Sequence, residues 1–376
     1  MSSKLSDLCA FADGRVAVAD LDLDTYISTE NMLPNKEGIT RSSGLPTVYQ
    51  TQAYRLDDVL VSNIRPYFKK IWYADRDGGC SNDVLVLRAK DCCIPGFLYY
   101  LLSDDNFFNY ATATAKGTKM PRGDKGAIMR YEVPDLPLEV QIGIADTLSA
   151  LDARIAENRA INNHLEQLAH TIFKSSFIGY EPTKPFTEVV QVLGGGTPKT
   201  TKTEYWDGSI PFFTPKDTQS LYILNTEKTL TEAGLSNCNS RLYPVNTVFV
   251  TARGTVGKLA IAGVPMAMNQ SCYALVGNSG YGQHFAYHLA LETVERLKHK
   301  ASGAVFDAIV TRDFESEMVA VPPIDVVNEF ENNVKPIYEA LLNNVKESFR
   351  LSSLRNSLLP KLMSGELKIA DSGDTK

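Results

Sequence analysis

Two long helical patterns constrain this 376-residue chain more than any other feature. In each pattern, seam residues recur at spacings of three or four residues, or of seven, which is the heptad repeat of paired helices. The first seam comprises Ile144, Leu148, Leu151, Ile155, Asn158, Leu165 and Ile172, and the second comprises Phe330, Val334, Ile337, Leu341, Asn344, Leu351 and Leu358. The seams match position by position, because Asn158 and Asn344 are 344 − 158 = 186 residues apart, as are Leu165 and Leu351. The sequence therefore predicts two long helices that pair through matching seams.

Each seam is interrupted by polar residues, Asn158 with Asn162 and Asn344 with Ser348. A buried Asn costs stability but fixes the register and the partner of paired helices. Alternatively, each helix packs on its own globular domain and the Asn residues lie at a solvated edge. The shared register favours pairing. Pro336 lies early in the second pattern, where it is expected to kink the helix or to mark its effective start.

The segments that precede the two helices also correspond. In each half, a short apolar strand, a basic turn and a second strand are followed by a helical stretch and an extended exit that ends in proline. In the first half these are residues 59–65, 81–87, 97–110 and 131–137, and in the second half residues 248–253, 269–276, 283–298 and 318–323. The chain is therefore predicted to be a tandem duplication of an α+β unit.

A duplicated chain can fold about a pseudo-two-fold axis, like a dimer made in one polypeptide. We therefore predict an α+β fold with two similar globular domains separated by two long antiparallel coiled-coil helices. The expected segments are residues 1–136, a first helix at 137–181, residues 182–322, a second helix at 323–369 and a tail at 370–376. A helix pair of roughly 30 residues is about 45 Å long, which exceeds one turn of B-DNA at about 34–36 Å.

Composition sets limits on function. The formal charge is 38 − 44 = −6, which argues against binding nucleic acid by bulk charge but allows local basic patches. The six cysteines include no C-x-x-C pair, so no zinc framework is expected. The chain lacks an N-terminal signal pattern and any run of about 18 apolar residues, so a cytoplasmic protein is expected.

Motifs for catalysis are weak. Residues 194–200, GGGTPKT, look like a phosphate-binding loop, but Pro198 stands where a Gly must precede the Lys. His284 and His288 are four residues apart, but Phe285 replaces the Glu that a zinc protease needs. No nucleophile triad and no cofactor loop stands out, so the chain is not expected to be a catalyst by itself.

Basic and hydroxyl-bearing residues gather in loops and strand ends of both halves, where such side chains can bind phosphates or read base edges. For any single residue, an ordinary solvated side chain explains it equally well, but the matching placement favours a function. The candidate DNA-binding residues are Arg65, Lys69, Lys70, Lys116, Thr118, Lys119 and Arg122 in the first half, and Thr197, Lys199, Thr200, Lys202, Thr214, Lys216, Arg253 and Lys258 in the second.

The whole pattern resembles the specificity subunit of Type I restriction–modification systems. The most specific marks are the GGTP turn at 195–198, the VPPI sequence at 321–324 and the closing stretch at 352–367. The first half departs from the pattern near its start, with Asp13, Gly14 and Arg15 in place of the GGTP turn.

The resemblance implies that each globular domain is a target recognition domain for one half of a bipartite sequence in double-stranded DNA. It also implies that the helices set the spacer length and dock two modification subunits, which methylate adenine with S-adenosylmethionine. Restriction subunits would add ATP- and Mg-dependent translocation and cleavage, so this chain itself would hold no cofactor and no metal. Two other functions are a duplicated protein–protein scaffold without DNA readout and a self-sufficient modification enzyme, which the missing cofactor motif disfavours.

Overall fold

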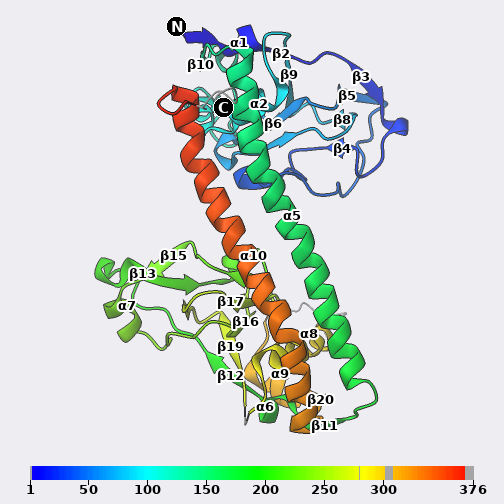
Figure 1. The fold of residues 1–376 in the computed structure, drawn as a ribbon, viewed down its shortest axis with the longest axis vertical. Coiled ribbons are helices and arrows are strands. Elements are labelled where there is room, and N and C mark those ends of the chain that lie inside the picture. The colour runs from blue at the N-terminus through cyan, green and yellow to red at the C-terminus, as the bar shows by residue number, and fades with distance from the viewer. Residues whose placement is uncertain (1, 279, 301–307, 369–376) are drawn as a thin grey trace, which may run out of the picture. The chain divides into compact units, whose positions relative to one another are not determined.

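The structure, a computed structural model, describes residues 2–278, 280–300 and 308–368 (Figure 1). The chain forms two compact units. The first unit comprises Met1–Ile155 and Arg350–Lys376, and the second comprises Ala156–Phe349. Each unit therefore contains a globular part and a piece of both long helices, whereas the sequence analysis treated the helices as separate segments.

The central sheet of the first unit has the strand order β2 (Cys9–Phe11), β9 (Val84–Ala89), β6 (Val59–Ser62) and β7 (Ile71–Tyr73), with antiparallel pairing throughout. Successive side chains of a strand point to opposite faces of the sheet. In β6, Val59 and Val61 pack into one buried cluster and Leu60 packs into another. This continuous apolar run therefore forms a strand that is covered on both faces.

A second sheet of the first unit has the order β3 (Arg15–Ala17), β5 (Gln50–Tyr54), β8 (Gly78–Cys80) and β4 (Tyr26–Ile27). Tyr54 of β5 meets Trp72 of β7 edge to face, with ring centroids 5.6 Å apart. A Cβ on Gly79 would lie within 2.8 Å of three neighbouring side chains. Only glycine allows β8 to approach its surroundings this closely.

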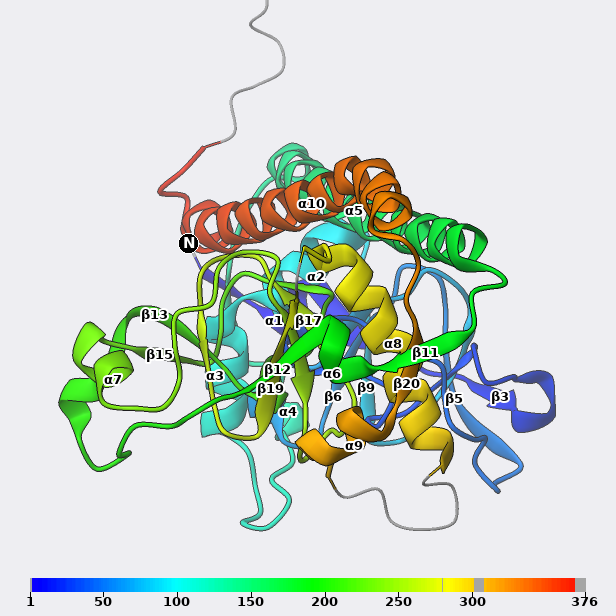
Figure 2. The same ribbon diagram turned by 90° about the horizontal axis from the view of Figure 1, so that it is seen from below.

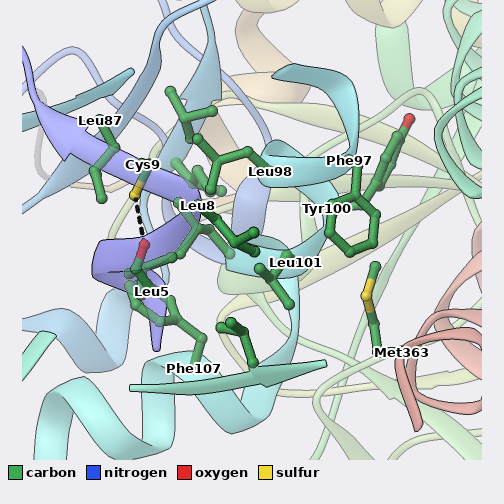
Figure 3. Close-up of a cluster of buried hydrophobic side chains, with 14 of the residues drawn as sticks. Leu5, Leu8, Cys9, Leu87, Phe97, Leu98, Tyr100, Leu101, Phe107 and Met363 are labelled. Atoms are coloured by element: carbon green, nitrogen blue, oxygen red, sulfur yellow. Dashed lines mark hydrogen bonds between the residues drawn. The ribbon is translucent and has the colours of Figure 1, made fainter. Parts of the chain in front are cut away.

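Two helices, α2 (Pro95–Ser103) and α3 (Asp105–Ala113), replace the single helical stretch predicted at 97–110. That prediction was wrong at Asp104, whose backbone is extended and whose side chain accepts a hydrogen bond from the backbone N–H of Asn106. An Asp at this position ends one helix and caps the next. Figure 3 shows Phe97, Leu98, Tyr100 and Leu101 of α2 in a buried cluster that Met363 joins from near the end of the chain.

The second unit repeats this plan. Its larger sheet has the order β12 (Val190–Gly194), β19 (Cys272–Gly277), β16 (Val248–Thr251), β17 (Leu259–Ala262) and β14 (Tyr222–Ile223). Its smaller sheet has the order β15 (Lys228–Leu230), β13 (Trp206–Phe213) and β18 (Ala267–Met268). In β16, Val248 and Val250 pack into one cluster and Phe249 into another, as in β6.

The first strand of each globular part pairs with the extended exit at the end of the same globular part. In the first unit, β1 (Ser2–Lys4) pairs with β10 (Glu132–Pro134), and in the second, β11 (Pro182–Pro185) pairs with β20 (Met318–Ala320), as Figure 2 shows for the latter. The helix that follows the central hairpin of the second unit is α8 (Gln283–Lys300). The remaining short helices are α1 (Leu5–Leu8), α4 (Lys125–Ile128), α6 (Phe186–Val189), α7 (Glu232–Ser236), α9 (Thr311–Ser316), η1 (Val18–Asp20), η2 (Pro34–Lys36), η3 (Pro66–Phe68), η4 (Thr203–Tyr205) and η5 (Pro215–Asp217).

The long helices are α5 (Leu138–Phe177) and α10 (Ile324–Ser364). In the first unit, Asp152 of α5 forms an ion pair with Arg355 of α10. In the second unit, Asn162 of α5 meets Asn344 of α10. Later residues of α5 thus meet earlier residues of α10, so the helices are antiparallel and the predicted fold class is confirmed. Pro336 lies well inside α10 and does not mark its start.

The seam residues are buried or half-buried along both helices. The fully buried ones are Ile144, Leu148, Ile155, Asn158, Phe330, Val334 and Leu341, and the half-buried ones are Leu151, Leu165, Ile172, Ile337, Asn344, Leu351 and Leu358. Several also join the core of the globular part of their own unit, as Leu148 and Val334 do. Asn158 is only 1% exposed, so the alternative that placed it at a solvated edge is wrong.

Candidate nucleic-acid interface

In the second unit, several candidate residues lie at one edge of the larger sheet. This edge holds the end of β12 at Gly194, the end of β16 at Thr251 and the start of β19 at Cys272, because the three strands are antiparallel neighbours. The hydroxyl of Thr197 donates a hydrogen bond to the side-chain oxygen of Gln270. The backbone N–H of Arg253 donates to the carbonyl of Ser271 at 3.3 Å. The two loops that carry Thr197 and Arg253 therefore meet on the segment before β19.

The GGTP turn is shaped by packing. A Cβ on Gly195 would lie 2.1 Å from the carbonyl oxygen of Asn269, and one on Gly196 would lie 2.6 Å from the backbone nitrogen of Asn239. The backbone N–H of Gly196 donates to the carbonyl of Met268 at 3.2 Å. These glycines let the turn lie against other backbone segments, so they are explained without a bound phosphate.

The η5 turn adds Thr214 and Lys216 to the same edge. The hydroxyl of Thr255 donates to the carbonyl of Pro215 at 3.4 Å, which joins this turn to the loop after β16. The Thr214 hydroxyl and N–H donate to Asp217 Oδ2 at 2.7 and 2.8 Å, so this hydroxyl caps the turn. Lys216 is exposed, and its Nζ lies 3.6 Å from Glu227 Oε2. Lys216 is therefore the exposed cation of this turn, and Glu227 is its partner.

The other candidates of the second unit are exposed. Lys199 and Thr200 lie in the loop before η4, and Lys258 begins the return towards β17. Lys202 pairs with Glu204 at 3.1 Å and lies 5.8 Å from the ring centroid of Tyr205. The hydrogen bond to Glu204 raises the pKa of Lys202 above its ordinary value. Trp206 Nε1 of β13 donates to the carbonyl of Lys199 at 3.4 Å, so Lys199, Thr200 and Lys202 lie by the smaller sheet, whereas Lys258 lies in the turn after β16.

In the first unit, residues 116–122 form a tight loop. Lys116 and Arg122 exchange backbone hydrogen bonds of 2.8 and 2.9 Å, and Thr118 and Lys119 are exposed between them. Lys116 Nζ lies 2.5 Å from Asp124, and Arg122 Nη2 lies 3.1 Å from Asp83 Oδ1. The loop therefore presents a cationic tip, while its ends are tied to the fold.

Arg65 lies beside this loop, because its backbone N–H donates to the carbonyl of Pro121 at 2.8 Å. The same turn carries Lys69, whose Nζ lies 3.0 Å from Asp105. Lys36, which the sequence analysis missed, lies 2.7 Å from the other oxygen of Asp105. Burial acts to raise the pKa of Asp105, but hydrogen bonds from the two lysines hold it below its ordinary value. No local sequence signal marks Lys36, because Asp105 and Lys69 are distant from it in the chain.

Lys70 is partly used by the fold. Its Nζ donates a 2.6 Å hydrogen bond to the carbonyl of Thr29, and burial lowers the pKa of Lys70. The aromatic residues around it divide into two groups. Trp72 is buried and Tyr73 is half-buried against the core, whereas Tyr67 is 47% exposed and Phe68 is 38% exposed. Exposed basic and aromatic side chains thus lie together at the η3 turn.

The turns of the two units are equivalent. After β6, the N–H of Ser62 donates to the carbonyl of Lys70 at 3.1 Å, and after β16 the N–H of Thr251 donates to the carbonyl of Lys258 at 2.9 Å. Both turns lie at the matching edge of matching sheets. The structure thus brings some candidate residues of each unit to one edge, namely Arg65, Lys69 and the 116–122 loop in one case and Thr197, Lys216 and Arg253 in the other, whereas Lys199 and Lys202 lie by the smaller sheet.

Among residues 2–278, 280–300 and 308–368, no group of three or more His, Cys, Asp or Glu side chains is placed to hold a metal ion. In the same part of the chain, every helix is too short or too polar to cross a membrane.

Comparison with known proteins gives one family. The family model described as "Type I restriction modification DNA specificity domain" matches residues 1–167 and 179–339. The Type I restriction enzyme MjaIX specificity subunit of Methanocaldococcus jannaschii is 24% identical over 75% of this chain and 71% of its own length. The HindI specificity subunit of Haemophilus influenzae is 23% identical over 91% of this chain and 94% of its own length.

A solved structure supports the fold. The crystal structure of a Type I restriction–modification S subunit from M. genitalium matches with a TM-score of 0.57 and 16% identity, and the match covers 96% of each chain. The family match spans the globular part of both units, most of α5 and the beginning of α10. The chain therefore belongs to the Type I restriction–modification DNA specificity family.

Proposed function

We propose that this chain is the DNA-recognition subunit of a Type I restriction–modification complex and that each unit reads one half of a bipartite target in double-stranded DNA. The observation that carries the proposal is the placement of a basic turn at the equivalent sheet edge of each unit, with Arg65 and Lys69 in one and Arg253 and Lys258 in the other. Lysine and arginine at such positions bind phosphates and read guanine edges.

The antiparallel helices serve as spacer and as docking site. A helix has a fixed rise per residue, so the length of the α5 and α10 pair sets how many base pairs separate the two half-sites. Exposed apolar side chains on these helices, such as Ile161, Leu168 and Leu354, support docking of two modification subunits. A scaffold without DNA readout would need no matched basic turns and is therefore disfavoured.

The chemistry belongs to the partner subunits in this proposal. Modification subunits would supply S-adenosylmethionine for adenine methylation, and restriction subunits would supply ATP- and Mg-dependent translocation and cleavage. This chain would recognise the target sequence and hold no cofactor. The proposal is supported by the family match together with the absence of a catalytic motif from the sequence.

The test is a map of methylated adenines in cells that carry the modification subunit with and without this chain. The expected result is one bipartite methylated sequence that appears only with the chain. In gel shifts with the modification subunits, affinity for a duplex bearing that sequence should fall steeply with salt, because phosphate contacts release counterions. A complex that assembles normally but methylates no defined sequence and binds DNA without salt dependence would instead support the scaffold.

A further inference from the structure

The η3 turn of the first unit exposes two aromatic rings side by side. Tyr67 and Phe68 are 47% and 38% exposed, and their ring centroids lie 4.8 Å apart at an interplanar angle of 54°. The neighbouring aromatic side chains of Trp72 and Tyr73 are buried and half-buried, respectively. Single exposed apolar residues are common, but a paired aromatic tip on a turn is typical of a contact surface.

The backbone holds this tip in an unfavourable conformation. Arg65 before the turn and Lys69 after it have φ angles of 49° and 51°, in the left-handed region that side chains with a Cβ disfavour. The equivalent turn after β16 has Gly254 and Gly257 with φ angles of 83° and 76°. The second unit thus makes the same turn without strain, and its tip residues, Thr255 and Val256, include no aromatic ring.

Cations surround the aromatic tip. Lys69 and Lys36 are held together by Asp105, at 3.0 and 2.7 Å. Lys70 Nζ lies 5.9 Å from the ring centroid of Phe68, and the N–H of Arg65 holds the 116–122 loop beside the turn. A ring pair flanked by lysines and arginines matches a nucleic acid, whose bases stack on rings and whose phosphates bind the cations.

We propose that Tyr67 and Phe68 form a wedge that inserts between adjacent base pairs in the half-site read by the first unit. This inference rests on the proposed function above. Apolar and aromatic side chains that enter a base step unstack it and kink the duplex, and the cations beside them hold the flanking phosphates. Because the second unit has Thr255 and Val256 at its turn, its half-site should remain stacked. The wedge thus makes recognition of the two half-sites unequal.

The experiment uses the complete chain assembled with its modification subunits and a duplex that carries the mapped target. 2-Aminopurine replaces adenines one at a time along both half-sites, except the adenines that the modification subunits methylate, because methyltransferases flip their target base out of the stack. Its fluorescence reports unstacking. The expected result is a rise confined to one base step of the first unit's half-site, which Tyr67→Ala/Phe68→Ala abolishes. The double variant should bind the target on the order of tenfold more weakly, because the stacking contacts are lost.

Salt dependence separates the wedge from a charge effect. The aromatic variant should keep the wild-type slope of log affinity against log salt, whereas Lys69→Ala should reduce that slope by about one. Leu56→Ala is the matched control, because Leu56 is 56% exposed and lies in the turn before β6, at the other end of that strand. Tyr67→Leu/Phe68→Leu keeps apolar bulk and is expected to restore part of the affinity if the double alanine variant is poorly folded.

The outcomes are distinct. If the wild-type complex shows no sequence preference, the proposed function fails. If it binds its target specifically but no base step gains fluorescence, or if both half-sites gain it equally, the wedge is wrong. The wedge is also wrong if the aromatic variants bind DNA like the wild type, or if they fail to assemble with the modification subunits, since the pair would then contact protein.

Discussion

The side-chain amide of Asn344 donates a 2.9 Å hydrogen bond to the side-chain oxygen of Asn162, joining α10 to α5 across 182 residues of sequence. The amide of Asn162 donates in turn to the carbonyl of Leu341 at 3.3 Å. Nearby, Asn158 donates to Glu347 Oε2 at 2.7 Å and to the hydroxyl of Ser348 at 3.3 Å. These bonds form only at one alignment of the two helices, so the polar layer fixes their register.

Asn158→Ala should destabilise the chain by about 1–3 kcal/mol, because it removes buried hydrogen bonds and leaves the Glu347 carboxylate with one donor fewer. Urea unfolding of the full chain, followed by circular dichroism, measures the change. Asn163→Ala is the control, since Asn163 is exposed on the same helix. Equal losses in the two variants would show that the polar layer contributes nothing specific.

An insertion into the helices should change the preferred spacer between half-sites. Four residues added near Asn158 lengthen α5 by about 6 Å, and seven added to both helices, after Ile155 and after Phe349, lengthen the pair by about 10.5 Å and keep the heptad phase. The second change corresponds to about three base pairs at about 3.4 Å each. Methylation mapping measures the spacer. Seven residues inserted after Gly179, outside α5, should leave the spacer unchanged. An unaltered spacer in every variant would refute the proposal that the helices set the spacer length.

Arg253→Ala or Lys216→Ala should weaken binding through one half-site only, because both residues lie in exposed turns of the second unit. Competition binding with duplexes mutated in either half-site measures this effect. A lost base contact should cost about 1–3 kcal/mol and relax specificity at one position. Lys184→Ala, a neutralised exposed lysine in β11, is the control. Equal weakening on unrelated DNA would instead mark Arg253 and Lys216 as phosphate contacts.

The stability of the second unit should depend on the charge of His288. This ring is buried, with its Nε2 2.9 Å from the hydroxyl of Tyr338 and its ring stacked 4.9 Å from that of Phe173. Burial, with the nearby His170 and His284, lowers the pKa of His288 to about 3. The unfolded chain has a histidine pKa of about 6.5. The contribution of neutral His288 to the free energy of unfolding is therefore fully present above about pH 6.5 and is lost as the pH falls towards 3.

His288→Phe should make the unfolding free energy less dependent on pH across this window, by at most about 1.4 kcal/mol per pH unit. The slope is the readout, since loss of the Tyr338 hydrogen bond also changes stability at neutral pH. Urea unfolding at several pH values measures it, with the exposed His164→Gln as control. Identical slopes for His288→Phe and the wild type would contradict the prediction.

An ion pair between a half-exposed arginine and a buried carboxylate supports the first unit. Arg88 donates to both oxygens of Asp58, from Nε at 2.7 Å and from Nη2 at 2.6 Å, and Asp58 is 1% exposed. Arg88→Met should destabilise the chain by about 1–3 kcal/mol, because the buried carboxylate of Asp58 keeps, among the residues that the structure describes, only the backbone N–H of Arg55 as a donor, while solvent screens the half-exposed side of the pair. The double variant Arg88→Met/Asp58→Leu should lose less in the same urea assay. A double variant as unstable as the sum of the single ones would refute this explanation.

Sequence patterns predicted the helices and central strands well, because these depend on repeated local features. Val59 to Val61 and Val248 to Val250 are short apolar runs, and the structure covers them on both faces. The break at Asp104 was missed, because the apolar pattern continues across it and only the extended backbone of one residue separates the helices.

The candidate interface was less predictable. The sequence identifies each charged side chain, but it does not identify the residue with which that side chain forms an ion pair or hydrogen bond. Thr214 caps a turn and Lys70 bonds to Thr29, so both are partly occupied by the fold, whereas Lys36 joins Lys69 only through Asp105. Which side chain is left free depends on segments far apart in the chain, and residue types alone do not disclose that.

The first unit is discontinuous: Leu359, Leu362 and Met363 of α10 belong to the same buried cluster as Leu5 and Phe97. During synthesis, a ribosome must therefore make the whole second unit before it can deliver the last pieces of the first. Until then the nascent N-terminal portion exposes an apolar surface, which a chaperone or an early-bound companion subunit would have to shield. A late stop codon that removes the last turns of α10 would therefore destabilise the N-terminal globular part first.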